Sequence, residues 1–257
     1  MQPFTDQHAV ITGGATGIGF ACANALIEDG ARVTLVGRTE QRLAASQTKL
    51  GDRCSYIVAD VSDEDSISAA IKQANQQHPL TIAVANAGTG SASPLLATEL
   101  QEWQRVIDTN LTGTFNTLKH AGQAMQANGG GAICAISSIA GLRTHKFMSA
   151  YCSSKAAIDM LVRNAADELG AAGIRVNSVC PGLVVTELST ALHETDAMRD
   201  DYLSCMPLSR LGQTEDIARA VRFLCGPESS WITGAILPVD GGHHLRRGPN
   251  IELLAEG

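Results

Sequence analysis

The chain contains 257 residues with a formal net charge of −7, and its composition is 44% hydrophobic and 18% charged. These values exclude an intrinsically disordered protein, and the length accommodates one or two folded domains. The acidic balance argues against a nucleic acid or an anionic membrane surface as the main partner.

Short β-branched runs alternate along the chain with longer segments of helical periodicity. Strands are expected at 8–12, 31–36, 55–59, 81–85, 132–137, 174–179 and 235–239. Helices are expected at 18–28, 40–50, 63–76, about 98–128, 151–169 and 214–225, and an irregular stretch follows Pro181-Gly182. No linker or repeat divides the chain. The alternation predicts one doubly wound, Rossmann-like α/β domain over 1–257, with a parallel sheet of about seven strands and helices on both faces.

Seven cysteines are present, but no two of them form a Cys-x-x-Cys pair. Their spacing therefore predicts no structural zinc site, dithiol redox site or disulfide framework. The first residues lack the basic and apolar segments of a signal peptide, and no apolar run is long enough to span a bilayer. We expect a cytoplasmic protein with no metal site and no membrane partner.

The first expected strand leads directly into a glycine-rich loop, Thr12-Gly13-Gly14-Ala15-Thr16-Gly17-Ile18-Gly19. Glycines let the backbone approach a ligand closely, and the N–H groups at a helix start suit a pyrophosphate. A plain turn that packs a helix on a strand is the alternative, but the position after the first strand favours dinucleotide binding. The spacing differs from the common Gly-x-Gly-x-x-Gly. It resembles the Thr-Gly-x-x-x-Gly-x-Gly of the short-chain dehydrogenases/reductases.

The end of the second expected strand bears on the choice of dinucleotide. An NAD site usually has Asp or Glu there, which bonds the ribose 2′-hydroxyl and repels a 2′-phosphate. In this chain the acidic position is Gly37, followed by Arg38 and Thr39. The Arg38 guanidinium could stack on adenine and pair with a 2′-phosphate, and a solvated arginine at a helix entrance is the alternative. Thr16 stands where NADP-preferring relatives often carry a second basic residue, so binding of the 2′-phosphate depends mainly on Arg38. Because of Arg38 we prefer NADP(H), with NAD(H) as the other option.

Two further segments resemble cofactor contacts of that family. Asp60-Val61, after the third expected strand, resembles the acidic residue and its neighbour that hold the adenine. Asn86-Ala87-Gly88, after the fourth, matches the family's Asn-Ala-Gly signature. Each segment alone would more often be a helix cap or turn, but the positions after strands three and four favour cofactor binding.

Tyr151 and Lys155 stand four residues apart, on one face of an expected helix. A phenol with a pKa of about 10 exchanges protons poorly at neutral pH. A neighbouring ammonium favours the phenolate, so we expect Lys155 to lower the pKa of Tyr151. The motif alone is weak, because a core-edge tyrosine followed by a solvated lysine occurs by chance.

Two other residues complete the catalytic pattern of the family. Ser138 ends the fifth expected strand thirteen positions before Tyr151, and Asn110 matches the family's helix asparagine. The resemblance implies that Tyr151 exchanges a proton with the substrate oxygen while Ser138 hydrogen-bonds the same oxygen. It also implies that Lys155 bonds the nicotinamide ribose and that Asn110 holds a water that relays protons. The expected catalytic region is 110–155, with hydride passing between nicotinamide and the carbonyl carbon.

The segment after the sixth expected strand completes the cofactor site. Pro181-Gly182 matches the family's turn, and the resemblance implies that the Val184 backbone and the Thr186 hydroxyl face the carboxamide. Substrate choice in such folds lies in the next segment, about 187–210, which we expect to act as a mobile lid. Its Met and Leu residues fit a lipophilic ketone or alcohol and equally fit ordinary helix packing.

Two basic features remain without a role in this pattern. Arg143 could hold an anionic substrate group, although a solvated loop arginine is the favoured interpretation. The tail 243–257 begins with two histidines and two basic neighbours, and we favour a subunit contact or a solvated tail over substrate contact. The resemblance also implies a homotetramer.

The sequence thus leaves several functions open. The first is an NADP(H)-dependent ketoreductase or alcohol dehydrogenase, and its nearest rival within the family is a 3-oxoacyl-thioester reductase. A non-catalytic dinucleotide-binding sensor is the alternative of another class. The complete set of Ser138, Tyr151 and Lys155 disfavours the sensor, because a sensor does not need a tuned phenol.

Overall fold

Apolar runs form seven strands within residues 3–246, which the computed structural model describes. The strands are β1 (His8–Thr12), β2 (Arg32–Gly37), β3 (Cys54–Val58), β4 (Ile82–Ala85), β5 (Gly131–Ile136), β6 (Ile174–Pro181) and β7 (Ile236–Val239). They pair in the order β3-β2-β1-β4-β5-β6-β7, and every neighbouring pair is parallel. The predicted parallel sheet and the doubly wound α/β class are confirmed.

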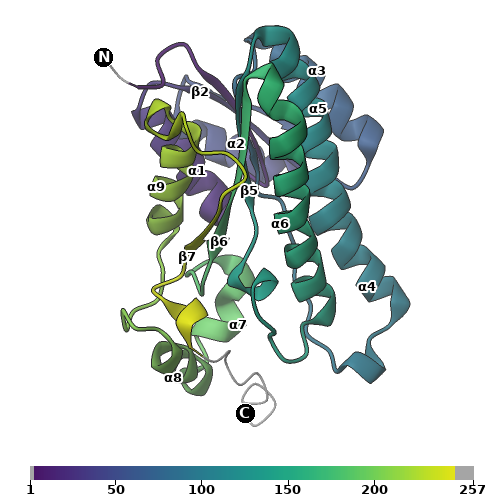
Figure 1. Cartoon of the computed structure of the whole chain (residues 1–257), viewed down its shortest axis with the longest axis vertical. Helices are drawn as coiled ribbons and strands as arrows, with labels where there is room; N and C mark the ends of the chain where they lie inside the picture. Colours follow the sequence, from purple (N-terminus) through teal and green to yellow (C-terminus); the bar gives the residue numbers. More distant parts are fainter. Residues whose placement is uncertain (1–2, 247–257) are drawn as a thin grey trace.

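Helices cover both faces of this sheet, as Figure 1 shows. They are α1 (Gly17–Glu28), α2 (Glu40–Leu50), α3 (Glu64–Gln77), α4 (Leu100–Ile107), α5 (Gly113–Asn128), α6 (Ser149–Leu169), α7 (Thr190–His193), α8 (Asp196–Cys205) and α9 (Thr214–Cys225). Helices α1, α2 and α9 pack on one face, and α3, α5 and α6 pack on the other. Within residues 3–246, no helix is both long and apolar enough to cross a bilayer.

The central strands are apolar on both sides because both faces of the sheet are covered. All five residues of β1 are buried. Its successive side chains alternate between the faces: Ala9 and Ile11 join the apolar cluster beneath α1 and α9, and Val10 joins the cluster beneath α3, α5 and α6. This alternation explains why the strand reads as an unbroken apolar run.

The strand order places a crevice between β1 and β4. After β1 the chain builds β2 and β3 on one side, and it then returns to add β4 on the other side of β1. The connections that leave β1 and β4 therefore diverge at the carboxyl ends of these strands, where open α/β sheets bind ligands. The glycine-rich loop follows β1, and the segment that begins at Asn86 follows β4.

The long helix expected over about 98–128 is interrupted in the structure. Helix α4 passes into a π-helical turn, Asp108–Thr112, before α5 continues. A π-turn inserts one extra residue and often occurs at functional sites. Asn110 lies within it and is fully buried.

The segment expected to be irregular after Pro181-Gly182 contains helices α7 and α8. The buried side chains of α8 are Met198, Tyr202 and Cys205. Their spacing of four and three residues is the helical signal that could have predicted this element. These helices lie beyond the sheet at one end of the molecule (Figure 1).

Candidate active site

The glycine-rich loop turns tightly over the end of β1. Gly13 has φ +62°, a conformation that favours glycine, and its N–H donates to the Val36 carbonyl at 2.8 Å. The Asn86 amide donates to the carbonyls of Thr12 and Gly13, both at 3.0 Å, which ties the loop to the segment after β4. A Cβ at Gly19 would lie 2.4 Å from the Gly13 oxygen, so the first turn of α1 can approach the loop only without a side chain there.

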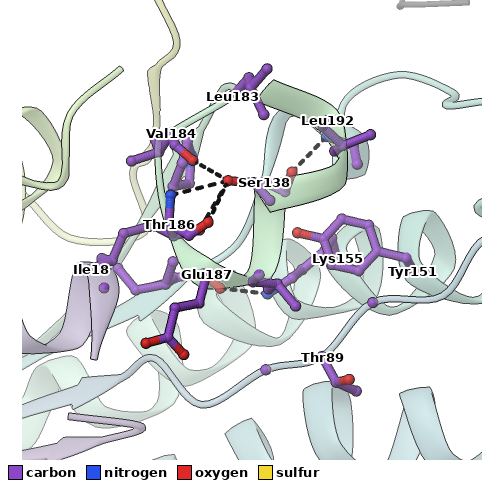
Figure 2. A pocket seen from close by; sticks show the side chains of 18 of the residues that line it. Ile18, Thr89, Ser138, Tyr151, Lys155, Leu183, Val184, Thr186, Glu187 and Leu192 are labelled. Carbon is purple, nitrogen blue, oxygen red and sulfur yellow. Dashed lines mark hydrogen bonds between the residues drawn. The ribbon is translucent and has the colours of Figure 1, made fainter. Parts of the chain in front are cut away.

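A cavity of about 690 Å³ opens from this loop along the carboxyl ends of the strands. Most of the predicted site residues line it. They are Gly13, Thr16, Gly17, Ile18, Asn86, Ala87, Gly88, Ser138, Tyr151, Lys155, Pro181, Gly182, Val184 and Thr186. Figure 2 shows several of them around the cavity, with Ile18 at one end and Tyr151 at the other.

The remaining predicted residues lie outside the cavity wall: Gly19, Arg38, Thr39, Asp60, Val61 and Asn110. Gly19 lies beneath the loop, and Thr39 is the N-cap of α2. Val61 is buried against Gly113 and accepts a hydrogen bond from Asn116, so its side chain supports the core.

Arg38 extends from the end of β2 with 70% of its side chain exposed. Its Nη1 lies 3.7 Å from Oδ2 of Asp60. The other carboxylate oxygen, Oδ1, accepts hydrogen bonds from the backbone N–H and the hydroxyl of Ser62. The Arg38–Asp60 pair is long and exposed, and such pairs contribute little to stability. The guanidinium is therefore available to a ligand at the rim beyond the cavity.

The shape and donors of this region fit a dinucleotide. Gly13 and Gly17 both have positive φ, and Thr16, the N-cap of α1, makes no side-chain capping bond to the first-turn N–H groups. Those N–H groups and the positive end of the helix dipole suit a pyrophosphate. The cavity then continues to Tyr151 and Lys155, where the reactive end of such a ligand would lie.

Three of the catalytic candidates converge from two elements, the end of β5 and helix α6. Ser138 follows β5 and accepts a hydrogen bond from the Ala140 N–H at 3.1 Å. Tyr151 and Lys155 project from the first turns of α6, with the Lys155 Nζ 5.6 Å from the centroid of the Tyr151 ring (Figure 2). Lys155 is only 4% exposed, and its ammonium donates to the Ile136 carbonyl at 2.8 Å.

The protonation of the phenol differs from the sequence-based expectation. Burial raises the pKa of Tyr151, and a hydrogen bond with Ser138 offsets only part of the rise. Burial also lowers the pKa of Lys155 to about 8, which the charge of Asp159 partly opposes. The Lys155 ammonium donates to the Ile136 carbonyl, and desolvation of the phenol is the largest cause of the change in the Tyr151 pKa. The expected lowering of the Tyr151 pKa is therefore not observed.

The Asn110 side chain is hydrogen-bonded to two segments next to the catalytic residues. Its Oδ1 accepts from the Thr89 N–H at 2.8 Å, and its Nδ2 donates to the Thr89 carbonyl and to Ser154 Oγ. Both Nδ2 protons are thus engaged within the protein. The side chain connects the π-turn to α6 and to the loop after β4.

The sequence did not single out Asp159, which lies one turn after Lys155. This carboxylate is buried and accepts a hydrogen bond from Ser178 Oγ at 3.0 Å, with Cys180 Sγ at 3.8 Å from both of its oxygens. Burial raises the pKa of Asp159, and these hydrogen bonds oppose the rise. A carboxylate four residues after Tyr-x-x-x-Lys could have been noted as a countercharge on the same helix face.

The segment between β6 and α7 is held at several points. The Thr186 N–H donates to Ser189 Oγ at 3.1 Å, and Ser189 Oγ donates to the Val184 carbonyl at 2.6 Å. Arg42, on α2, pairs with Glu187 at 3.0 Å across the cavity mouth. Sequence reasoning did not anticipate Arg42, because the lid that it meets lies 145 residues further along the chain.

The start of the C-terminal tail corrects a prediction. His243 is fully buried, with its ring 5.6 Å from that of Tyr202 and 6.2 Å from that of His145. Arg143 donates to the backbone carbonyls of His243 and His244 and does not line the cavity. The expected solvated tail is therefore wrong for His243. Residues 247–257 of that tail lie outside the described residues.

Across residues 3–246, no group of three or more histidine, cysteine, aspartate or glutamate side chains is placed to hold a metal ion. All seven cysteines are free thiols.

Comparison with known proteins identifies relatives over nearly the full length. The family model for enoyl-(acyl carrier protein) reductase matches residues 13–244. The chain is 36% identical to a galactitol 2-dehydrogenase (L-tagatose-forming) of Cereibacter sphaeroides, covering 91% of this chain and 94% of the relative. It is 37% identical to a 3-oxoacyl-[acyl-carrier-protein] reductase of Chlamydia muridarum, covering 92% and 97%.

Solved structures also match this chain over nearly its full length. A short-chain type dehydrogenase/reductase from Mycobacterium ulcerans superimposes with a TM-score of 0.96 at 38% identity, covering 98% of this chain and 95% of that one. A gluconate 5-dehydrogenase from Burkholderia cenocepacia, in complex with NADP and tartrate, gives a TM-score of 0.92 at 30% identity, covering 95% and 97%.

Proposed function

The chain belongs to the short-chain dehydrogenase/reductase family, and on that premise we propose a specific reaction for it. The protein transfers a hydride between NADP(H) and a small carbonyl or secondary-alcohol substrate, with Tyr151 as the acid and base. The observation that carries this proposal is that Ser138, Tyr151 and Lys155 open into one cavity with the glycine-rich loop. A sensor that only bound the dinucleotide would need the loop but not the other three residues.

The geometry supports the following roles. In reduction, the Tyr151 hydroxyl donates its proton to the carbonyl oxygen, and Ser138 donates a hydrogen bond to the same oxygen. Because burial raises the pKa of Tyr151, the phenol carries its proton at neutral pH, and it can pass that proton on as the carbonyl oxygen gains negative charge. Lys155 holds the ribose next to the nicotinamide, and Asn110 braces the backbone around it. When bound, the dinucleotide supplies or accepts the hydride.

Replacement of Tyr151 by phenylalanine tests the acid/base assignment. We expect Tyr151→Phe to lower kcat by about a thousandfold or more while dinucleotide binding persists, because only the proton donor is removed. NADPH oxidation with a ketone panel measures turnover, and fluorescence titration measures binding. Tyr56→Phe is the matched control, since the Tyr56 hydroxyl contacts only Glu40 at 3.5 Å among its described partners. A Tyr151→Phe variant that retained wild-type turnover would contradict the proposal.

Arg38 supports the preference for NADP(H). It follows the last residue of β2, Gly37, where no carboxylate is present to repel a 2′-phosphate. The neighbouring structure with bound NADP is in keeping with this preference. We expect Arg38→Ala to raise the KM for NADPH at least about tenfold and to leave the KM for NADH nearly unchanged, because only NADPH carries the 2′-phosphate.

Arg219→Ala, an exposed arginine on α9, is the control for that experiment. Equal use of NADH and NADPH by the unmodified protein would count against the preference.

A second function is favoured by a relative. The 3-oxoacyl-[acyl-carrier-protein] reductase of Chlamydia muridarum covers nearly the whole chain, so reduction of a 3-oxoacyl thioester is the alternative. Turnover of acetoacetyl thioesters with an efficiency well above that of free ketones would favour it.

Size-exclusion chromatography with light scattering tests the homotetramer that the family resemblance implies. The free cysteines are in keeping with a reducing compartment such as the cytoplasm.

A further inference from the structure

Two buried polar side chains stand in the cavity wall near Tyr151 without a role in the proposed proton transfer. His145 lies in the loop before α6 and is 7% exposed, and Tyr202 projects from α8 and is 3% exposed. Both residues line the cavity, and Tyr151 lines the same cavity at its reactive end. A few polar side chains in the wall of a largely apolar pocket fix the orientation of a ligand, so these two point to a polar group on the substrate.

Both side chains are uncharged at neutral pH. Burial lowers the pKa of His145 to about 4, and the charges of His243 and Arg143 lower it too, while the Arg143 backbone carbonyl opposes them in part. Burial raises the pKa of Tyr202, and the proximity of Tyr151 and Asp201 adds to the rise. A neutral imidazole has one donor and one acceptor, and a phenol has both on one oxygen. This combination suits a hydroxyl group better than a carboxylate.

The charges around the cavity agree with this preference. Among the described residues that line it, only Arg42, Lys155 and Glu187 ionise at neutral pH. Arg42 and Glu187 pair with each other, and Glu187 lies towards Ile18 and the glycine-rich loop in Figure 2, away from Tyr151. Lys155 donates to the Ile136 carbonyl.

The described cations next to these two residues have other partners: Arg143 donates to the carbonyls of His243 and His244, Arg246 donates to the Ser204 carbonyl on α8, and Lys146 lies over the Phe147 ring. A carboxylate next to His145 and Tyr202 would therefore have to draw one of these cations away from its present partner. Burying such a charge without a partner is strongly unfavourable.

We propose that His145 and Tyr202 form a specificity site for a neutral hydroxyl group, so that the preferred substrates are uncharged hydroxyketones and the corresponding polyols. This inference rests on the proposed function and names its substrate class. In the reduction, the carbonyl carbon gains a hydride, for which NADPH is the reductant, and the oxygen gains the proton of Tyr151. The remote hydroxyl is unchanged and only orients the carbonyl. Met148 and Leu192, which also line the cavity, pack on the carbon chain between them.

Three ketones of the form CH₃–CO–CH₂–CH₂–X test the proposal, because they differ only in X. In 2-pentanone X is methyl, in 4-hydroxy-2-butanone it is hydroxyl, and in levulinate it is carboxylate. We expect kcat/KM with saturating NADPH to be about tenfold or more higher for the hydroxyketone than for 2-pentanone, and lowest for levulinate. A hydroxyketone no better than 2-pentanone, or a preference for levulinate, overturns the proposal.

Variants connect the preference to its residues. His145→Leu and Tyr202→Phe should each reduce the ratio of kcat/KM between hydroxyketone and 2-pentanone towards one. His145→Gln, which retains a donor and an acceptor, should retain part of that ratio. His78→Leu, an exposed histidine at the end of α3 that does not line the cavity, is the matched control and should leave the ratio intact. An unchanged ratio in both His145→Leu and Tyr202→Phe overturns the assignment.

The same experiment tests the specificity site and the proposed reaction separately. Reduction of 2-pentanone and the hydroxyketone at equal rates overturns the specificity site and leaves the proposed reaction in place. No turnover of any ketone or acyl thioester, with NADPH still bound, overturns the proposed reaction and this inference with it.

Discussion

At the scale of single residues, the site depends on a buried cation with a buried carboxylate behind it. Lys155 would lose its proton more readily than an ordinary lysine, because burial lowers its pKa to about 8. The charge of Asp159 raises that pKa and so keeps more of the ammonium protonated. Ser178 holds the Asp159 carboxylate in place. Asp159, which does not line the cavity, therefore contributes to the protonation of a residue that does.

Replacement of Asp159 by asparagine tests this role. Without the carboxylate the pKa of Lys155 falls further, so the ammonium is lost at a lower pH. We expect the alkaline limb of the kcat profile to move to lower pH, so that the ratio of kcat at pH 8.5 to kcat at pH 7 is about threefold lower in the variant than in the unmodified protein. Asp167→Asn, on the exposed side of the same helix, is the control. A profile with unchanged shape would show that Asp159 acts only on stability.

Residue identities at the site could be read from the sequence, whereas their protonation could not. Tyr151, Lys155 and Ser138 were predicted from their spacing, and the fold brings them to one cavity. The predicted effect of Lys155 on the Tyr151 pKa was not observed, because the sequence does not show how deeply the phenol is buried or where the ammonium points. His145 was missed for the same reason: only the folded loop places it in the wall.

At the scale of elements, α1 and the glycine-rich loop depend on close backbone approach. The space above Gly19 is filled by the Gly13 oxygen and by the Asn86 amide. A methyl group there must move α1 away from the loop. Such a shift alters the packing of α1 on the loop and the position of its first-turn N–H groups next to the cavity.

Gly19→Ala should therefore affect stability and ligand binding together. We expect a loss of roughly 1–3 kcal/mol in the free energy of unfolding and a dinucleotide Kd at least about tenfold weaker. Urea denaturation and fluorescence titration measure the two effects. Gly170→Ala is the control, because a Cβ at that position meets nothing within 4 Å and the backbone is helical. Wild-type binding by Gly19→Ala would mean that the loop tolerates a shift of α1.

Most elements were predictable because their periodicity is strong. The strands and the helices α1, α2, α3, α6 and α9 lie within two residues of the predicted bounds. The π-turn around Asn110 was not predictable, since no glycine or proline within 108–112 marks an interruption of the helix. Helices α7 and α8 were missed because their apolar residues pack on the cavity end and on each other, not on the sheet.

At the scale of the whole molecule, the burial of thiols gives a simple check on the fold. Six of the seven cysteines are buried, and Cys152 alone is partly exposed. We expect one thiol per chain to react quickly with a water-soluble disulfide reagent in the native protein and seven to react after denaturation. Reductant should leave Tm unchanged, because no disulfide exists to be broken. Rapid reaction of three or more thiols in the native state would contradict the packing of the two sheet faces.

The position of β7 in the sheet has a consequence for synthesis on the ribosome. β7 alone covers the outer edge of β6, yet it begins 55 positions after β6 ends. At ordinary elongation rates the nascent chain therefore presents an unpaired edge on β6 for roughly 3–11 s before its partner emerges. Open edges pair readily with other strands, so we expect association between partly made chains to be most frequent at that stage.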